Sequence, residues 1–370
     1  LYAYTLSGGA FSIDNISIIE ITEDTDIPRI DYTDGTPTLL VEPQSTNLVT
    51  YSEDFSDAYW TKNGVSVVGG FTSPSGDLSA FKLVENTSSV HVINNTNNNF
   101  SSPTDASYSI FVKYNGRQWV RLFCEFGTTS YNSWFDILNG VTGTSSADTS
   151  DIQDYGNGWF KITQTNSLDA INGRYRLYLA DADNSNTYIG DGVSGVYIWG
   201  AQAEALSYAT SYIPTSGAIA TRLADVVTGA GDATTFNDSE GVLYAEIDGA
   251  YAGRLGVQGD ANNRVAIYFG GVGGTRIQLI YRANGVTSLH NVDPLNPQGL
   301  FKYAIKWSAS NVYFYVNGVL EKTTAISNSL VGLNELTLTI DNLKLSGKVK
   351  DLRTYNTALT DAELQTLTTI

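Results

Sequence analysis

The sequence is poor in several residue types, and each shortage excludes a class of protein. A single cysteine, Cys124, excludes an intrachain disulfide framework, so the domains must be held together by packing. No apolar run approaches the ~20 residues that a membrane-spanning helix needs. The first residues lack the basic start and long apolar run of a secretory signal. Methionine is absent even at position 1, and we therefore expect the chain to be part of a longer protein.

Positive charge is also scarce. Lys and Arg number 21 against 38 Asp and Glu, which gives a net charge of −17. Because such a chain repels nucleic acid and anionic membranes as a whole, we expect neither nucleic-acid binding nor membrane insertion. The two histidines, His91 and His290, lie far apart in the sequence, so no metal cluster or Ser-His-Asp triad can be read from them.

Turn residues and short alternating stretches are abundant instead. The chain holds 35 Gly and 23 Tyr, a composition typical of a turn-rich β-protein. Apolar and polar residues alternate in many short runs, such as 118–126 and 174–181, with Gly, Asn, Ser and Asp clusters between the runs. This spacing predicts an all-β fold of tandem β-sandwiches joined by short polar linkers. A helix is predicted for 359–367 alone, with Thr360 and Glu363 forming a capping box.

A short internal sequence repeat indicates the domain boundaries. The runs 11–21 and 196–206 each enter a loop that contains Ile-Pro and leads to an Arg followed by an Asp two or three positions on. Ile13 and Ile198, which correspond, lie 185 residues apart, roughly one sandwich and its connector. Unless this short similarity arose by chance, the chain divides into the last strand of a preceding truncated sandwich (1–26), a connector (27–45), a sandwich (46–206), a linker (207–235) and a second sandwich (236–370). The small polar residues of the linker are typical of a joint between independent domains.

The start and end of the 46–206 domain resemble known families. The segment TNLVTYSEDFSDAYWTKNGVSV resembles the first strand of jelly-roll carbohydrate-binding modules, with Asn47-Leu48, Asp54-Phe55 and Trp60 at the matching positions. The segment LLVEPQSTNLVTYSEDFSDAYWTKNG, residues 39–64, together with WGAQAEALSYATSYIPTSG, residues 199–217, is similar to a domain repeated in virion proteins of tailed phages, in tail fibres and head spikes. This resemblance implies a homotrimer on the virion surface, hence extracellular, in contact with other virion proteins.

The last third of the chain resembles concanavalin- and laminin-G-like sandwiches, through the segments 301–324 and 345–367. That fold is common and says little about function. Jelly-roll modules often carry a structural calcium, and Asp181, Asp183 and Ser185 begin like a calcium loop. They lack the glycine and the later Glu of a complete loop, so we interpret them as a polar hairpin loop. We expect no cofactor, with a structural calcium left open by the resemblance.

Alternation also predicts which side chains point outward. If the strands at 107–114, 118–126, 159–165 and 174–181 belong to one sheet, its outer face combines aromatic rings with arginine and lysine. Aromatic rings stack on the C–H faces of sugars, and cationic side chains donate hydrogen bonds to hydroxyl or carboxylate groups. The predicted carbohydrate-binding residues are Trp119, Arg121, Phe123, Trp159, Lys161, Arg176 and Tyr178. A subunit interface has a similar composition, and a misassigned core is the third alternative.

The sequence contains one weak indication of a catalytic site. Glu246 and Asp248 stand two positions apart on a predicted strand, ~6.6 Å along it, which is near the separation of paired glycosidase carboxylates. Concanavalin-like glycosidases have a third carboxylate nearby, but Ala250 and Tyr251 follow here. Surface acids explain the pair equally well, and we expect no enzymatic activity.

These features together favour a non-catalytic virion fibre or spike protein. Its function would be adhesion to polysaccharide or host-surface glycans, with weak sites made effective by repetition. One alternative is a purely structural capsid or tail decoration protein whose aromatic face is a subunit interface. Another is an accessory binding region of a secreted polysaccharide-degrading enzyme.

Overall fold

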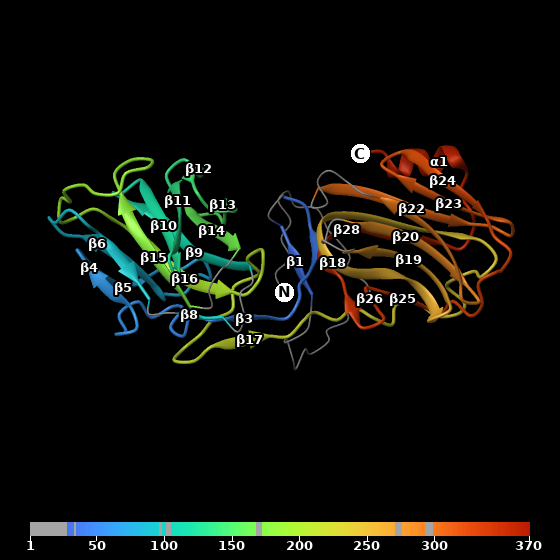
Figure 1. The fold of residues 1–370 in the computed structure, drawn as a ribbon, viewed down its shortest axis with the longest axis horizontal. Helices are drawn as coiled ribbons and strands as arrows, with labels where there is room; N and C mark the ends of the chain where they lie inside the picture. Colours follow the sequence, from blue (N-terminus) through green and yellow to red (C-terminus); the bar gives the residue numbers. More distant parts are fainter. Residues whose placement is uncertain are drawn as a thin grey trace, which may run out of the picture.

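The computed structural model describes residues 28–32, 35–95, 98–100, 105–167, 172–270, 276–292 and 299–370. Within these residues the chain forms two β-sandwiches and a short C-terminal helix, which confirms the predicted all-β fold (Figure 1). The strand predicted for 1–26 lies outside the described residues. The sandwiches lie at opposite ends of an elongated molecule, and strand β1 (Arg29–Asp31) lies between them (Figure 1).

The N-terminal sandwich consists of two antiparallel sheets. The first sheet runs in the order β12-β11-β10-β15-β7-β4, with β8 beside β15. Its strands are β4 (Thr61–Asn63), β7 (Val92–Asn94), β8 (Asn98–Asn99), β10 (Trp119–Phe126), β11 (Thr129–Asp136), β12 (Val141–Ser145) and β15 (Asn172–Ala180). The second sheet runs in the order β13-β14-β9-β16-β6-β5. Its strands are β5 (Val65–Phe71), β6 (Ala80–Glu85), β9 (Asp105–Asn115), β13 (Thr149–Asp154), β14 (Trp159–Ser167) and β16 (Gly195–Glu204).

The core of this sandwich lies between the two sheets, because alternate side chains of each strand point inward. On β10 the alternation places Val120, Leu122, Cys124 and Phe126 inside, and all four are fully buried. Cys124 is a free thiol, and burial raises its pKa. It is therefore a small core residue rather than a reactive thiolate.

The aromatic-rich stretch 51–60 packs against this core. Phe55 and Trp60 are buried there, with their ring centroids 5.0 Å apart. The Trp60 indole donates a hydrogen bond to the Tyr51 carbonyl at 2.8 Å, which satisfies its one polar atom. The stretch that resembles carbohydrate-binding modules is thus a structural part of the sandwich, and the rings of Phe55 and Trp60 are not available to a ligand.

The C-terminal sandwich is built around the long strand β18 (Gly241–Asp260), which passes from one layer to the other. In the first layer its beginning lies between β28 (Ser346–Tyr355) and β22 (Leu300–Trp307), and the layer continues through β23 (Asn311–Val316) to β24 (Val319–Ala325). In the second layer its end pairs with β19 (Asn263–Phe269), followed by β20 (Ile277–Ala283) and β21 (Val286–Val292). The short strands β25 (Glu335–Thr337), β26 (Thr339–Ile340) and β27 (Leu343–Lys344) lie beside β18.

The C-terminal helix α1 (Asp361–Thr368) covers the outer face of the first layer. Its Leu364 is buried against Val242, Tyr244 and Tyr315. The predicted capping box is confirmed, because Thr360 and Glu363 exchange hydrogen bonds at the N-terminus of the helix.

Two short strand pairs connect the sandwiches. β1 and β2 (Thr38–Val41) form a hairpin, and β2 pairs with β28, so the hairpin extends the first layer of the C-terminal sandwich. β3 (Ser45–Asn47) then pairs with β17 (Ala220–Arg222), which belongs to the linker. The Asn47 side chain is fully buried and makes four hydrogen bonds, donating to the carbonyls of Ala201 and Ile213 and accepting from the amides of Val49 and Ala203.

A buried carboxylate, Glu42, holds this joint together. Arg29 from the hairpin and Arg222 from the linker both form ion pairs with Glu42. A guanidinium nitrogen of Arg222 lies 3.2 Å from a carboxylate oxygen of Glu42. The Ser211 amide donates to Glu42 at 2.7 Å, and the Glu42 amide donates to the Asp225 carboxylate at 2.8 Å. Hydrogen bonds and ion pairs therefore fix segments that composition alone would leave as flexible joints.

Candidate functional site

The predicted carbohydrate-binding residues divide between the two sheets of the N-terminal sandwich. Trp119, Arg121 and Phe123 lie on β10, and Arg176 and Tyr178 lie on the neighbouring β15 of the first sheet. Trp159 and Lys161 lie on β14, which belongs to the second sheet. The premise that these strands share one sheet is therefore wrong. Alternation determines whether a side chain faces the core, but not which sheet its strand joins.

Neither Trp159 nor Lys161 is accessible, with exposed fractions of 3% and 6%. Trp159 packs with Phe111 and Trp199 on the outer face of the second sheet. Tyr212 from the linker packs against Trp199, with the two ring centroids 4.5 Å apart. Lys161 donates to the Thr210 carbonyl at 2.7 Å, and burial lowers its pKa although Glu204 and Glu42 oppose this shift. These two side chains point away from the core as predicted, but the linker packs over them.

The other five residues come together on the outer face of the first sheet. Arg121 lies directly across from Tyr178, and Phe123 lies directly across from Arg176. The Arg121 guanidinium carbon lies 3.9 Å from the Tyr178 ring centroid, and that of Arg176 lies 4.9 Å from the Phe123 centroid. Trp119 begins the same strand on the same face and is half-buried. Five of the seven predicted residues therefore form one contiguous surface.

Trp134 lies on the same side of the sheet, is only 4% exposed, and was not predicted. β11 follows β10 through the two-residue turn 127–128, which sets Trp134 directly opposite Arg121. The Trp134 ring centroid lies 5.5 Å from the Arg121 guanidinium. The short Gly-containing turn is the sequence signal that gives this register. We name Trp119, Arg121, Phe123, Trp134, Arg176 and Tyr178 the aromatic–arginine face.

Arg121 is the centre of this face and is only 7% exposed. Rings of Phe123, Trp134 and Tyr178 surround its guanidinium, which also donates a hydrogen bond to Asn186. Burial lowers the pKa of Arg121, with Tyr178 opposing the shift, but an arginine stays charged at neutral pH. Phe123 and Tyr178 are half-buried, so part of each ring faces solvent. The face is thus a rigid set of rings held around one cation.

The loop 181–186 borders the face. The Trp134 indole donates to the Ser185 carbonyl at 2.9 Å, and Thr144 donates to the Asp183 carboxylate from its amide and its hydroxyl at 2.8 and 2.9 Å. Asp181 accepts a hydrogen bond from the Ser185 hydroxyl. These contacts make it a polar loop, as the sequence favours, but not a hairpin, because β15 before it and β16 after it belong to different sheets. No group of three or more His, Cys, Asp or Glu side chains among the described residues is placed to hold a metal ion.

Each member of the acidic pair on β18 lies near a lysine. Glu246 is 3.6 Å from the Lys302 ammonium, and Asp248 is 3.6 Å from the Lys350 ammonium. Both lysines come from neighbouring strands of the first layer. This arrangement is typical of cross-strand ion pairs on a sheet surface.

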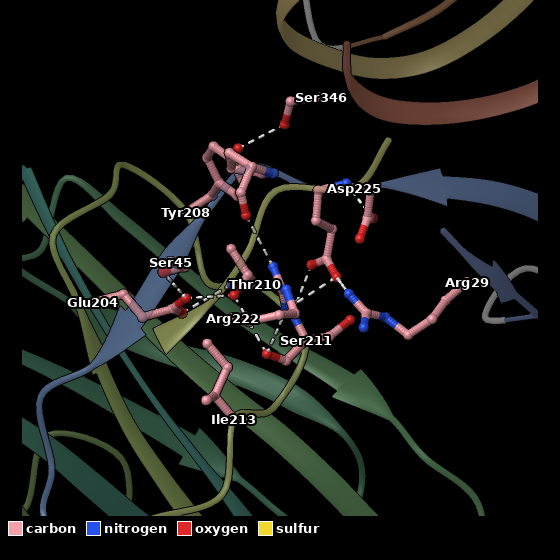
Figure 2. Close-up of polar contacts among 12 residues, drawn as sticks. Arg29, Ser45, Glu204, Tyr208, Thr210, Ser211, Ile213, Arg222, Asp225 and Ser346 are labelled. Carbon is pink, nitrogen blue, oxygen red and sulfur yellow. Dashed lines mark hydrogen bonds and ion pairs between the residues drawn. The ribbon is translucent and has the colours of Figure 1, made fainter. Parts of the chain in front are cut away.

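A cleft of about 550 Å³ lies between the sandwiches, at the joint. Charged residues of both signs line it, and they pair with one another, as Lys348 does with Asp31 at 2.6 Å. Tyr208, also in its wall, reaches across to Ser346 at 2.7 Å (Figure 2). The cleft is polar, and its lining residues hold the two sandwiches together.

Among the described residues, no helix is long and apolar enough to cross a membrane.

Comparison with solved structures gives remote similarities. Over 36% of its length the chain resembles a leech intramolecular trans-sialidase complexed with 2,7-anhydro-Neu5Ac, at 17% identity and a TM-score of 0.30. Over 35% it resembles the binding domain of botulinum neurotoxin DC in complex with SialylT, at 13% identity and a TM-score of 0.28. The chain spans 24% and 35% of those two proteins. Domains LG4-5 of the mouse laminin α1 chain match over 92% of this chain and 96% of that one, at 8% identity and a TM-score of 0.28.

The family comparison concerns the C-terminal sandwich. No curated protein matches the chain. Residues 234–365 match the laminin-G family model described as the concanavalin A-like lectin/glucanases superfamily. The matched residues include all strands of that sandwich except those of the β1–β2 hairpin. The C-terminal sandwich is therefore similar to concanavalin A-like domains, over about a third of the chain.

Proposed function

We propose that the protein is a non-catalytic adhesion protein that binds glycans through the aromatic–arginine face. The observation that carries the proposal is the gathering of four aromatic rings and two arginines on one outer sheet face, in a chain with only 21 cationic residues. Half-buried Phe123 and Tyr178 offer ring surface for stacking on sugars, and Arg176 offers guanidinium donors to hydroxyl or carboxylate groups.

The rigidity of the face favours binding. Arg121 is held by three rings and by Asn186, and Arg176 is held by the Glu125 carboxylate and Phe123. Side chains that are already ordered lose little conformational entropy when a ligand binds. Weak single sites of this kind become effective when many copies act together.

The place of action that we propose is the virion surface of a tailed phage. The support is the resemblance of 39–64 and 199–217 to a domain repeated in tail fibres and head spikes. In the structure the two segments are in contact, because the Asn47 side chain donates a hydrogen bond to the Ile213 carbonyl. We propose that the protein acts there as a homotrimer in contact with other virion proteins.

A glycan array probed with the whole chain tests this function. We expect binding to at least one glycan, and Phe123→Ala should weaken it about tenfold, because one stacked ring contributes roughly 1.5 kcal/mol. Tyr114→Ala is the matched control, since Tyr114 is 41% exposed on the second sheet, away from the face. Absence of binding, together with loss of an oligomer in Phe123→Ala, would make the face a subunit interface. Release of reducing sugar from a polysaccharide would refute the non-catalytic assignment.

A further inference from the structure

The cleft between the sandwiches has two walls, and each wall is the outer face of a sheet. One wall is the edge of the second sheet of the N-terminal sandwich, where Gln153 on β13 lies directly across from Lys161 on β14. The other wall is the first layer of the C-terminal sandwich, where Asp248 on β18 lies directly across from Lys348 on β28. In Figure 1, β13 and β14 lie on the side of their sandwich that faces β1. A cavity of about 550 Å³ between two domains is typical of sites that bind small ligands.

The chain itself holds the two walls in place. Glu42 connects the hairpin and the linker through its ion pairs with Arg29 and Arg222. Tyr208, from the linker, is hydrogen-bonded to Ser346 of the C-terminal wall at 2.7 Å. A site that is already formed loses little conformational entropy when a ligand binds. The cleft is therefore a preformed site that a ligand does not have to open.

Exposed apolar side chains lie at the rim of this cleft. Tyr155, at the end of β13, is 46% exposed, and Phe111 packs against its ring with a centroid distance of 4.8 Å and an interplanar angle of 88°. Ile30 on β1 is exposed on the opposite wall. A second hollow shares Tyr155 and Asp31 with the cleft and adds the exposed ring of Tyr32. We name the cleft and this hollow together the interdomain groove.

The charged side chains of the groove leave a carboxylate free but no cation. Each cation that lines the cleft already has a partner in the chain, in the pairs Arg29–Glu42, Lys348–Asp31 and Lys161 with the Thr210 carbonyl. Asp151 is exposed, and its carboxylate forms no hydrogen bond or ion pair within the part of the chain that the structure describes. An anionic ligand thus finds no free cation in the groove. Sugar hydroxyl groups donate hydrogen bonds to a carboxylate, and sugar C–H faces pack on exposed rings.

We propose that the interdomain groove binds a short neutral oligosaccharide. Its hydroxyl groups donate to Asp151, and its C–H faces lie on Tyr155 and Tyr32 at the rim. The groove lies on the outer face of the second sheet, and the aromatic–arginine face lies on that of the first. The two sites are therefore on opposite sides of the N-terminal sandwich, and this inference does not depend on the aromatic–arginine face.

Titration calorimetry with the whole chain tests the groove. The neutral probes are cellohexaose, maltohexaose and N-acetylchitohexaose, and the charged references are hexagalacturonate and glucosamine hexamer. We expect at least one neutral probe to bind, and to bind more tightly than both references. Tyr155→Ala should weaken this binding about tenfold through the loss of one stacked ring, and Asp151→Ala should weaken it about tenfold through the loss of a charged acceptor. Tyr114→Ala is the matched control, because Tyr114 is exposed on the same sheet but does not line the groove.

Each other outcome counts against the groove. No binding of any neutral probe, tighter binding of a charged reference, or equal effects of Tyr155→Ala and Tyr114→Ala would overturn the proposal. If melting shows that Tyr155→Ala does not fold, Asp151→Ala decides, because this exposed carboxylate has no partner in the described chain to lose. Phe123→Ala should leave the binding of the neutral probe unchanged. Binding that is lost in Phe123→Ala and kept in Tyr155→Ala would refute the groove and support the aromatic–arginine face, so the two proposals fail separately.

Discussion

Replacing Glu42 with Gln tests how firmly the joint connects the sandwiches. The Glu42 side chain is 6% exposed, and it faces the side chains of Arg222, which is 10% exposed, and Arg29, which is 39% exposed. Removing one partner of a buried ion pair costs about 3–5 kcal/mol. Arg29 can turn toward solvent, and Gln still accepts a hydrogen bond from the Ser211 amide. Because both effects reduce the cost, we expect the free energy of unfolding to fall by about 2–4 kcal/mol. For a domain of this size that corresponds to a fall in melting temperature of about 4–15 °C.

The pH dependence of this loss identifies its cause. Burial alone would raise the pKa of Glu42, but Arg222, the Ser211 amide and Arg29 outweigh burial and lower the pKa below its usual 4.5. A carboxylate with a lowered pKa stabilises the fold above that usual value, and the stabilisation disappears as the pH falls through the folded pKa. The stability difference between the native chain and Glu42→Gln should therefore be full at pH 7 and shrink below about pH 4.5.

Scanning calorimetry and chemical denaturation from pH 3 to 8 measure this difference. Asp351→Asn is the control, because Asp351 belongs to the exposed ion pair with Arg353 and should change stability by less than about 0.5 kcal/mol. We also expect Glu42→Gln to separate the unfolding of the two sandwiches into two transitions. A stability loss below about 0.5 kcal/mol, or one that does not change with pH, would refute the ionic account of the joint.

Two further substitutions separate structural residues from binding residues. Asn47→Ala leaves four buried backbone groups unpaired, among them the Ile213 carbonyl. We therefore expect the free energy of unfolding, measured by urea denaturation, to fall by about 3–5 kcal/mol. A loss below about 1 kcal/mol would show that water or rearrangement replaces these bonds. Lys161→Met removes a buried cation that the sequence assigns to the glycan site, and we expect unchanged glycan affinity with a stability change of less than about 1.5 kcal/mol. Weakened glycan binding in this variant would return Lys161 to the site.

The sequence predicts the local structure of this chain well because short-range patterns determine it. Alternation along β10 identifies the core residues from Val120 to Phe126, and the spacing of Thr360 and Glu363 identifies the helix cap. Each of these patterns involves residues that are close together in the chain. The same logic would have found Trp134, since only two residues separate β10 from β11.

The position of each strand in a sheet was not predictable in the same way. β14 carries the same aromatic and cationic alternation as β10, but it pairs with β9 in the other sheet. Lys161 and Trp159 point outward, yet the linker residues Thr210 and Tyr212 cover that face. Pairings between residues so far apart in the chain leave no periodic signal in the sequence. The linker itself has a composition typical of a flexible joint, and its fixed place depends on Glu42 and Arg222, which are 180 positions apart.

The position of a bound sugar tests the central claim most directly. A crystal structure of the whole chain with the strongest ligand from the glycan array should show a sugar ring on the aromatic–arginine face. We expect the ring within about 4 Å of Phe123 or Tyr178, with Arg176 donating to one of its oxygen atoms. A sugar bound elsewhere, or a second copy of the chain covering Phe123 and Tyr178, would contradict the claim that this face binds glycans.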